Sequence, residues 1–350
     1  MINLERYNYA VPPSLIRKRG VSPRDHARLF IYDMARDTIT HDRFYNLVRY
    51  LPRNTLLVLN NTKVVPARLW LKKESGGKIE VFVLANEMTP RQKEVPFLVD
   101  RKCAVGKKIF FPNGAFIVVR RQEKNKFFGV LHGQTKRDTL SHLLARYGAT
   151  PIPHYLDGAD VAERTLRTRY QTIFAKSGAA VAAPTAALHF TPRVFASLAR
   201  KKIVPAELTL NVGRGTFAPV REENFQTNRL HAEHIIIAKS VAEKINRARA
   251  RGNPIAAVGT TSIRALETAF ARGSVRPFDG ETTLFVYPPH RFHVADILLT
   301  NFHLPQSSLM LLVDAFLQHK KSEKNIGDLY AVAIQEKYAF YSFGDSMLIL

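Results

Sequence analysis

One histidine stands among small, uncharged side chains in the stretch from Ala179 to Thr191, which reads AAVAAPTAALHFT. Alanines around a Pro-Thr step allow a backbone to come close to something flat or bulky, and His189 is the only titratable residue in the stretch. We predict a ligand wall in which Thr185 binds a cofactor and His189 acts as an acid or a base. The alternative is a buried strand and turn whose histidine is a hydrogen-bonded core residue.

A carboxylate lies between two imidazoles in HAEH, His231 to His234. On a strand, His231 and Glu233 would share one face, and His234 would point the other way. Because the spacing differs from the HExxH of a zinc helix, we expect no metal site here. We predict instead that His231 and Glu233 form a general acid/base pair.

A strand, a turn and a helix are predicted around the sequence AAVGTTSIRALE. Free amides at the start of such a helix form an anion site that the helix dipole favours, and a guanidinium one turn further on can bind a carboxylate through two hydrogen bonds. The alternative is an ordinary capped helix. The residues predicted to bind a cofactor carboxylate here are Gly259, Thr260, Thr261, Ser262 and Arg264.

Further polar side chains lie in the apolar surroundings of LLTNFHLP, just before the last strongly apolar helix. Buried polar groups need partners. We predict that His303 is catalytic and that Asn301 and Asp296 bind a substrate, with a purely structural turn as the alternative. Arg291 belongs to a predicted basic, aromatic-lined edge that binds the substrate. Phe217 in GRGTF offers the substrate a stacking face, with a structural bulge as the alternative.

The elements that must position these residues change in character along the chain. The apolar run TLLVLN, Thr55 to Asn60, predicts a buried strand. Short β-type runs follow, separated by glycine-containing turns, at residues 69–73, 78–85, 95–99, 109–111, 115–121 and 126–132. Beyond residue 150 strands and helices alternate, with strands at 181–183, 207–212, 254–258 and 283–286 and helices at 192–202, 238–251, 262–272 and 304–317.

This pattern predicts an α/β main domain with an inserted small β-barrel domain. We expect residues 1–67 and 141–350 to form the discontinuous α/β domain and residues 68–140 to form the barrel. The chain of 350 residues is long enough for two such units.

Charge and composition narrow the class of protein. The formal net charge is +23, which predicts an acidic partner and, because basic residues occur along the whole chain, a broad nucleic-acid footprint. A basic composition without a specific target is the alternative. One cysteine excludes an internal disulfide, and no apolar run predicts a membrane span or a signal peptide, so we expect a cytoplasmic protein.

The ordered motifs resemble the QueA family, the S-adenosylmethionine:tRNA ribosyltransferase-isomerases of queuosine synthesis, over nearly the whole chain. The resemblance rests on SPRDHARL, LLVLNNTKVVPARL, RYQTIFA, AAVAAPTAALHFT, LTLNVGRGTFAPV, LHAEH, AVGTTSIRALETA, LLTNFHLPQSSLMLLVDAF and YAFYSFGDSML. It implies the same two-part fold. It also implies that Arg68 and Tyr170, which lie inside two of these motifs, bind the substrate.

Enzymes of this family use S-adenosylmethionine as a ribosyl donor rather than a methyl donor. The resemblance therefore implies transfer and isomerisation of that ribosyl group onto 7-aminomethyl-7-deazaguanine in the wobble position of tRNA, which gives epoxyqueuosine-tRNA, adenine and methionine. The implied partner is a tRNA with a GUN anticodon. No permanently bound cofactor and no metal are implied, S-adenosylmethionine is a co-substrate, and the protein is expected to be a monomer without membrane contact.

The chain departs from the family pattern at several positions. Asn211 stands where the family's LHVG motif has a histidine, Asn228 stands near another usual histidine, and Ala232 replaces a serine. The segment NNTK replaces the usual NDTR, and Ala187 replaces a glycine. We expect a divergent but active enzyme, because the other predicted polar residues remain. The alternatives are a non-catalytic tRNA-binding protein of the same fold and, less favoured, an ordinary methyltransferase.

Overall fold

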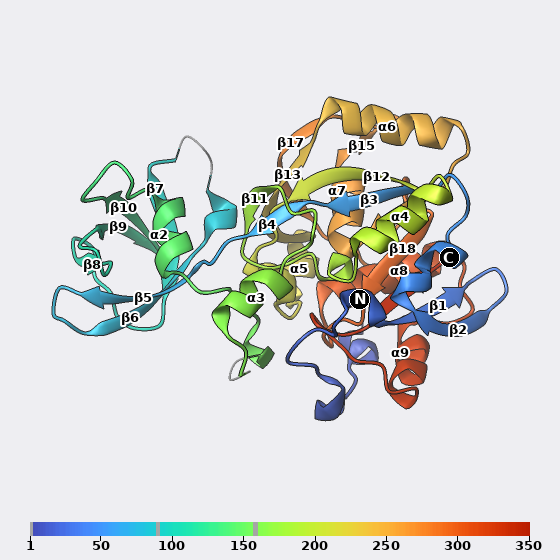
Figure 1. Ribbon diagram of the computed structural model, residues 1–350, viewed down its shortest axis with the longest axis horizontal. Coiled ribbons are helices and arrows are strands. Elements are labelled where there is room, and N and C mark those ends of the chain that lie inside the picture. The colour runs from blue at the N-terminus through green and yellow to red at the C-terminus, as the bar shows by residue number, and fades with distance from the viewer. Residues whose placement is uncertain (1–2, 89–91, 157–159) are drawn as a thin grey trace.

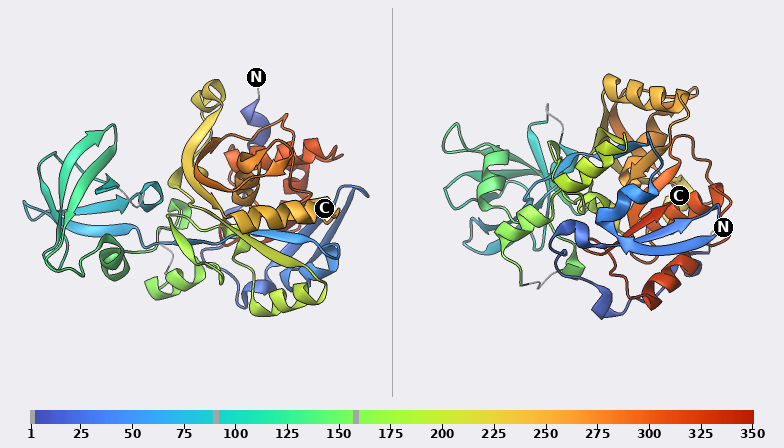
Figure 2. Two further views of the ribbon diagram at one scale, coloured as in Figure 1. Left: turned by 90° about the horizontal axis from the view of Figure 1, so that it is seen from above. Right: turned by 45° about the vertical axis from the view of Figure 1, so that its right-hand side comes forward.

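The computed structural model describes residues 3–88, 92–156 and 160–350, and it divides into two lobes of unequal size (Figure 1). The smaller lobe lies at one end of the long axis, and both chain termini are on the larger lobe. The view from above shows the same separation (Figure 2).

A mixed nine-stranded sheet forms the centre of the larger lobe within the described residues. Its strands, in order across the sheet, are β17 (Phe278–Leu284), β13 (Arg229–Ile237), β12 (Val204–Leu210), β3 (Leu56–Asn60), β14 (Ile255–Val258), β18 (Ile297–Asn301), β19 (Ser346–Ile349), β1 (Arg28–Asp33) and β2 (Thr38–Arg43). The four central strands from β12 to β18 are mutually parallel. Their carboxyl ends therefore meet at one edge of the sheet.

Helices cover both faces of this sheet, so the predicted α/β layering is confirmed. On β3, Leu56 and Val58 face one core, and Leu57 and Leu59 face the other. This two-sided burial explains why the strand is continuously apolar rather than alternating. The first face carries α6 (Lys239–Ala250), α7 (Thr260–Ala269), α8 (Ser308–His319) and α9 (Ile326–Gln335), and the second carries α1 (Leu47–Tyr50) and α4 (Pro192–Arg200).

The smaller lobe is a closed barrel of six antiparallel strands, in the order β10–β7–β6–β5–β8–β9. Each strand lies within a few residues of one of the six predicted β-type runs: β5 (Arg68–Lys73), β6 (Lys78–Val83), β7 (Glu94–Val99), β8 (Lys108–Phe110), β9 (Phe116–Glu123) and β10 (Lys126–His132). Alternate residues face a separate apolar core. The helix α2 (Leu140–Tyr147) contributes Leu143 and Leu144 to that core, so it packs with the barrel.

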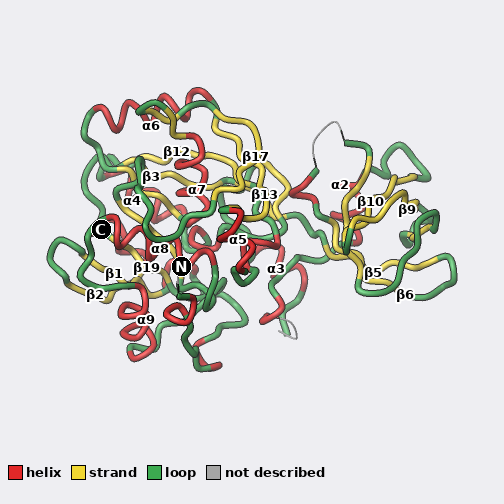
Figure 3. The backbone as a smooth tube through the Cα atoms, turned by 180° about the vertical axis from the view of Figure 1, so that it is seen from behind, coloured by secondary structure: helices red, strands yellow, loops and turns green. Residues whose placement is uncertain are grey.

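The two segments that join the lobes run side by side (Figure 3). Arg68 and Ala149 exchange both backbone hydrogen bonds, at 3.2 and 2.7 Å. A Cβ atom on the adjacent Gly148 would lie 1.8 Å from the carbonyl oxygen of Pro66, so only glycine permits this approach.

Shorter elements complete the fold. They are β4 (Thr62–Val64), β11 (Ser177–Ala180), β15 (Phe270–Ala271), β16 (Ser274–Val275), α3 (Glu163–Arg169) and α5 (Glu222–Thr227), with the 3₁₀ turns η1 (Leu4–Tyr7), η2 (Pro13–Leu15), η3 (Arg24–His26), η4 (Phe44–Asn46), η5 (Ala85–Glu87), η6 (His154–Leu156), η7 (Thr185–Ala187) and η8 (Arg214–Phe217).

Two predicted elements are placed differently in the structure. The strand expected at 181–183 lies at Ser177–Ala180, where it pairs with β4, and Pro184 then leads into η7. The helix expected to begin at residue 304 begins at Ser308, because Gln306 adopts a φ of 51° and the Ser307 side chain caps the first turn. The helix predicted at 262–272 and the strand predicted at 283–286 are α7 and β17, which begin earlier.

Candidate functional site

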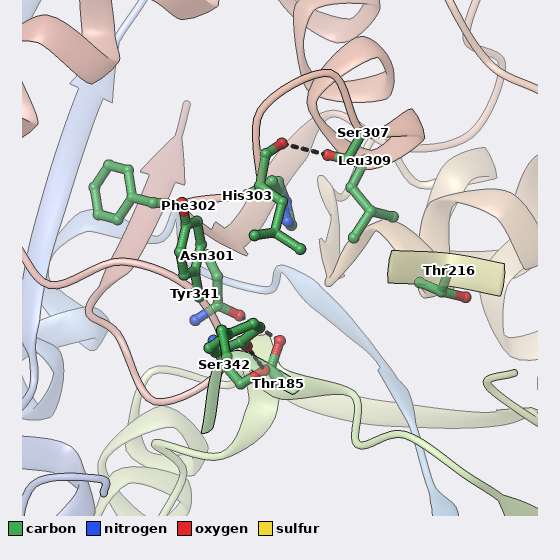
Figure 4. Close-up of a pocket in the computed structure, with 11 residues that line it drawn as sticks. Thr185, Thr216, Asn301, Phe302, His303, Ser307, Leu309, Tyr341 and Ser342 are labelled. Carbon is green, nitrogen blue, oxygen red and sulfur yellow. Dashed lines mark hydrogen bonds between the residues drawn. The ribbon is translucent and has the colours of Figure 1, made fainter. Parts of the chain in front are cut away.

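Two adjoining pockets lie beyond the carboxyl ends of β14 and β18, where ligands bind in open α/β sheets. Together they form what we call the central pocket. Each is a small hollow that is partly open to solvent. Both are lined by Thr185, Thr216, Asn301, His303 and Leu309 (Figure 4). The structure therefore brings the predicted residues Thr185, Asn301 and His303 together.

Small side chains form one wall of the central pocket, as predicted. Residues 183–186 line it, and so do Gly259, Thr260 and Thr261 at the start of α7. The Thr185 hydroxyl donates to Asn301 Oδ1 over 2.9 Å, which ties η7 to the end of β18. Asn301 Nδ2 donates in turn to the Asp345 carbonyl over 3.3 Å.

His303 is a neutral imidazole at the edge of this pocket. Burial lowers its pKa to about 3. One ring nitrogen, Nε2, lies 2.8 Å from the Thr300 hydroxyl. The backbone is fixed from both sides, because the His303 amide donates to the Tyr330 hydroxyl over 2.8 Å and its carbonyl accepts from Tyr9. The ring is therefore uncharged at neutral pH.

The helix α7 begins at the pocket, and no side chain of its N-cap residue accepts a hydrogen bond from the first turn. Gly259 is this N-cap and has a φ of 85°, a conformation that favours glycine. Ser262 does not line the pocket, and its hydroxyl donates to the Val258 carbonyl over 2.7 Å. Of the residues predicted to bind a cofactor carboxylate, Gly259, Thr260 and Thr261 line the central pocket, and the Gly259 amide is already bonded to the Leu299 carbonyl.

Arg264 binds a carboxylate, but that carboxylate is internal. Its guanidinium pairs with Glu233 Oε2 and donates through Nε to the Leu284 carbonyl over 3.2 Å. Glu233 Oε1 accepts from the Gly213 amide at 2.8 Å and the Thr216 hydroxyl at 2.6 Å. Both side chains of the ion pair are about 96% buried. Glu233, paired with Arg264, thus holds Thr216 at the pocket, and Arg264 Nη2 has no hydrogen-bond partner among the described residues. The predicted roles of Arg264 as a cofactor ligand and of Glu233 as an acid or base stay predictions.

His231 stays outside the central pocket. Its side chain is exposed and packs against Gly215, where a Cβ atom would lie 2.3 Å from His231 Cδ2. His231 and Glu233 both contact the 213–216 segment, so the shared face was predicted correctly. Only Glu233 is buried, and the two residues do not form an acid/base pair in one cavity.

His189 lines a different pocket, which we call the His189 pocket. It is lined by Gly20, Val21, Arg24, Arg169, Leu188, His189, Ser342 and Phe343. Burial lowers the pKa of His189 to about 4, and its ring lies 5.2 Å from that of Phe44. The two pockets share Ser342 alone. The structure therefore does not place His189 and His303 around one cavity.

The other predicted substrate residues are dispersed. Tyr170 is buried with its ring 5.7 Å from Phe343, next to the His189 pocket. Arg68 lies at the base of the barrel, 3.4 Å from Glu80. Asp296 accepts from the Ile255 amide over 2.9 Å at the amino ends of β14 and β18, the sheet edge opposite the central pocket. Arg291 is exposed in the loop between β17 and β18 and lines neither pocket. The Phe217 side chain lies outside the described part of the structure.

No group of three or more histidine, cysteine, aspartate or glutamate side chains among the described residues could hold a metal ion. No helix in the described ranges is both long and apolar enough to cross a membrane.

Comparisons with known proteins cover the full length of the chain. The family model described as "Queuosine biosynthesis protein" matches residues 4–349. The S-adenosylmethionine:tRNA ribosyltransferase-isomerase of Moorella thermoacetica is 40% identical over 351 residues, which is 100% of both chains. The chain belongs to this family.

Other relatives support the assignment. The enzyme of the same name from Thermosynechococcus vestitus is 41% identical, over 99% of this chain and 96% of that one. The crystal structure of the S-adenosylmethionine tRNA ribosyltransferase from Thermotoga maritima matches with a TM-score of 0.55 and 30% identity, over 99% and 100% of the two chains.

Within the queuosine biosynthesis family, Asn211 departs from the histidine expected in its motif, and the structure gives it a supporting role. Asn211 Oδ1 accepts from the Thr62 hydroxyl at 2.9 Å and from the Ala179 amide at 3.1 Å. A Cβ atom on Gly178 would lie 2.3 Å from the same oxygen. Asn211 therefore joins β12 to β4 and β11 instead of lining a pocket.

Sequence reasoning missed the wall between the two pockets. This wall is the segment 339–345, which contributes Tyr341, Ser342 and Phe343 to the pockets. Tyr341 adopts a φ of 70°, a strained conformation for a non-glycine residue. The segment is held by Asp345, whose carboxylate accepts from Arg17, the Arg28 amide and the Ala339 amide. The motif YSFGD was its only sequence signal.

Proposed function

We propose that this protein transfers and isomerises the ribosyl group of S-adenosylmethionine onto 7-aminomethyl-7-deazaguanine in the wobble position of tRNA. The products are epoxyqueuosine-tRNA, adenine and methionine. The observation that carries the proposal is the full-length match to enzymes named for this activity, at about 40% identity. We infer that the reaction takes place in the central pocket, at the carboxyl ends of the parallel strands.

The roles of individual residues follow from the pocket. The wall of residues 183–186 accommodates a flat adenine ring, and the first amides of α7 favour the methionine carboxylate of the co-substrate. His303, neutral at physiological pH, accepts or passes on a proton during the reaction. Thr185 and Asn301 orient the reacting groups, and the Glu233–Arg264 pair positions Thr216.

The partner and the surroundings belong to the same proposal. The net charge of +23 suits a tRNA with a GUN anticodon. S-adenosylmethionine is a co-substrate and not a resident cofactor, the protein works in the cytoplasm, and it acts as a monomer.

We also propose that the barrel is an inserted domain. Residues 68–148, including α2, form most of one apolar core, which also takes in Ala67 and Val181 and is distinct from the two cores on the faces of the large sheet. The return of the chain beside its exit, at Arg68 and Ala149, matches an insertion into one loop of the α/β domain. Expression of residues 66–150 alone, followed by a thermal unfolding measurement, tests this division.

A non-catalytic tRNA-binding protein is the second candidate, and Asn211 is the observation that favours it. An amide cannot replace a titratable imidazole as a base. If the family's histidine at this position is indispensable, this chain binds tRNA without turning it over.

One assay separates these candidates. The protein is incubated with labelled S-adenosylmethionine and tRNA carrying the deazaguanine precursor. We expect free adenine, methionine and ribosylated tRNA. Formation of S-adenosylhomocysteine would indicate methyl transfer, and retained tRNA without any product would indicate a binding protein. Either result would refute the proposed function.

A further inference from the structure

The His189 pocket contains a buried polar atom without a partner. His189 is 5% exposed, and its Nε2 has no hydrogen-bond partner. The ring also makes a hydrogen bond to the backbone of Arg24 that favours the protonated form, so the ring donates in that bond. The unpartnered nitrogen of the neutral ring is therefore an acceptor. A buried acceptor is costly when unpaired, so this atom points to a ligand that brings an N–H or O–H donor.

Two guanidinium groups line the same pocket without a carboxylate partner among the described residues. Arg24 donates to the carbonyls of Gln171, Leu188 and Thr168, and Arg169 donates to Val21 and Ser22. The nearby carboxylates are used elsewhere, because Asp25 pairs with Arg193 and Asp345 pairs with Arg17.

These like charges repel each other. Burial, followed by the neighbouring Arg169, lowers the pKa of Arg24. Lys18 and Arg19, exposed next to Gly20, add positive charge at the rim. An anionic group entering the pocket would relieve this repulsion.

The remaining lining is apolar and aromatic, with Val21, Leu188 and Phe343. The pocket is a small hollow that is partly open to solvent, so a ligand would present one edge to it rather than be enclosed by it. A flat ring with a donor edge, joined to a phosphate, matches the acceptor, the apolar walls and the arginines together.

We propose that the His189 pocket binds one nucleotide of the tRNA, with an N–H group on the edge of its base donating to His189 Nε2 and its phosphate held by Arg169. Arg24, already held by three carbonyls, supplies the supporting charge. Because Ser342 lines both pockets, this nucleotide lies directly beside the central pocket. The inference rests on the proposed function for the identity of the RNA. It assigns His189 to substrate binding instead of proton transfer.

The test compares the ligands guanosine 5′-monophosphate, ribose 5-phosphate and an anticodon stem-loop RNA. Saturation-transfer NMR measures the two small ligands, and fluorescence anisotropy measures the RNA. We expect Arg169→Ala to weaken all three by about tenfold or more, because it removes a charge-assisted hydrogen bond. We expect His189→Phe to weaken the nucleotide but not ribose 5-phosphate, and His189→Gln to restore part of the binding, because its side-chain oxygen can accept in place of Nε2.

Arg164→Ala is the matched control, since Arg164 is an exposed arginine on the same helix α3 and does not line the pocket. Circular dichroism verifies that each variant folds. If His189→Phe does not fold, Arg169→Ala and His189→Gln still test the proposal. Equal effects of Arg169→Ala and Arg164→Ala would overturn the proposal. The proposal would also be overturned if Arg169→Ala and His189→Phe both abolished the binding of S-adenosylmethionine, because the pocket would then bind the co-substrate. Adenine release by the wild-type protein, measured separately, tests the proposed function alone.

Discussion

At the scale of single residues, burial decides which polar groups can take part in chemistry. His303 and His189 are buried and neutral, and each lines a pocket. Glu233 and Arg264 are equally buried and form an ion pair, in which Arg264 Nη2 keeps no hydrogen-bond partner among the described residues. The same residue types therefore differ in their surroundings, and their partners decide which of them line a pocket with an atom left to bind.

The two buried histidines should make the protein less stable in mild acid. Their pKa values, about 4 for His189 and about 3 for His303, lie below the value of about 6.5 in an unfolded chain. As the pH falls below about 6.5, the unfolded state binds protons that the folded state does not. Their contribution to stability is thus complete above this pH and is lost on acidification, by about 2 kcal/mol for each histidine near pH 5.

Urea denaturation at neutral pH and near pH 5 measures this effect. His189→Phe should remove about half of the pH dependence that the two histidines cause. If the pH dependence is the same in this variant as in the wild type, His189 is not a buried neutral histidine in solution.

Loss of Glu233 should destabilise the protein strongly. Glu233→Ala leaves the Arg264 guanidinium buried without its carboxylate, which costs about 3–5 kcal/mol. Glu233→Gln keeps the shape and some hydrogen bonds and should cost less. Chemical denaturation measures both, and Glu222→Ala, at an exposed carboxylate, is the control. A loss from Glu233→Ala as small as that of the control would contradict the buried ion pair.

At the scale of elements, the site depends on segments that join distant parts of the chain. The end of β18 supplies Asn301, η7 supplies Thr185, and the start of α7 supplies Thr260. The segment 339–345 separates the central pocket from the His189 pocket. The carboxylate of Asp345 anchors it by accepting three hydrogen bonds. Anchoring this segment therefore shapes both pockets at once.

Asp345→Ala should damage both pockets together. The carboxylate is fully buried and accepts three hydrogen bonds, so we expect a loss of about 3 kcal/mol or more in unfolding free energy. KM should rise for both S-adenosylmethionine and tRNA. Arg17→Ala should have a smaller effect, since Asp345 keeps both backbone donors. An Asp345→Ala variant with wild-type stability and unchanged KM values would show that the anchor is dispensable.

At the scale of the whole molecule, the chain forms two lobes that have different apolar cores. The chain as a whole is strongly basic. The barrel extends along the long axis away from the central sheet (Figure 1). Such a shape offers an RNA a long surface, and the charge offers it many phosphate contacts.

Binding of tRNA should therefore depend steeply on salt. If about six phosphates are contacted, affinity falls by roughly 10³-fold between about 50 and about 200 mM salt, because bound counterions are released. Filter binding over a salt series measures the slope. A nearly constant affinity would mean that the net charge of +23 does not serve nucleic-acid binding.

The sequence by itself determined the elements with a strong local pattern and the family. The apolar run of β3, buried on both faces, and the six alternating strands of the barrel were predicted within a few residues. Hydrophobic periodicity records which faces are buried, and it is local. The small-residue stretch was also predicted to form a wall, and residues 183–186 line the central pocket. That a ligand binds against it stays a prediction.

Only the tertiary structure decided which polar groups meet. His189 and Thr185 are four residues apart, yet they face different pockets, because η7 turns the chain between them. Arg264 pairs with Glu233, and Asp296 directly precedes β18 whereas Asn301 ends it. Such contacts between distant residues depend on the order of strands in the sheet and on the path of the long loops that connect them. Neither leaves a local pattern in the sequence.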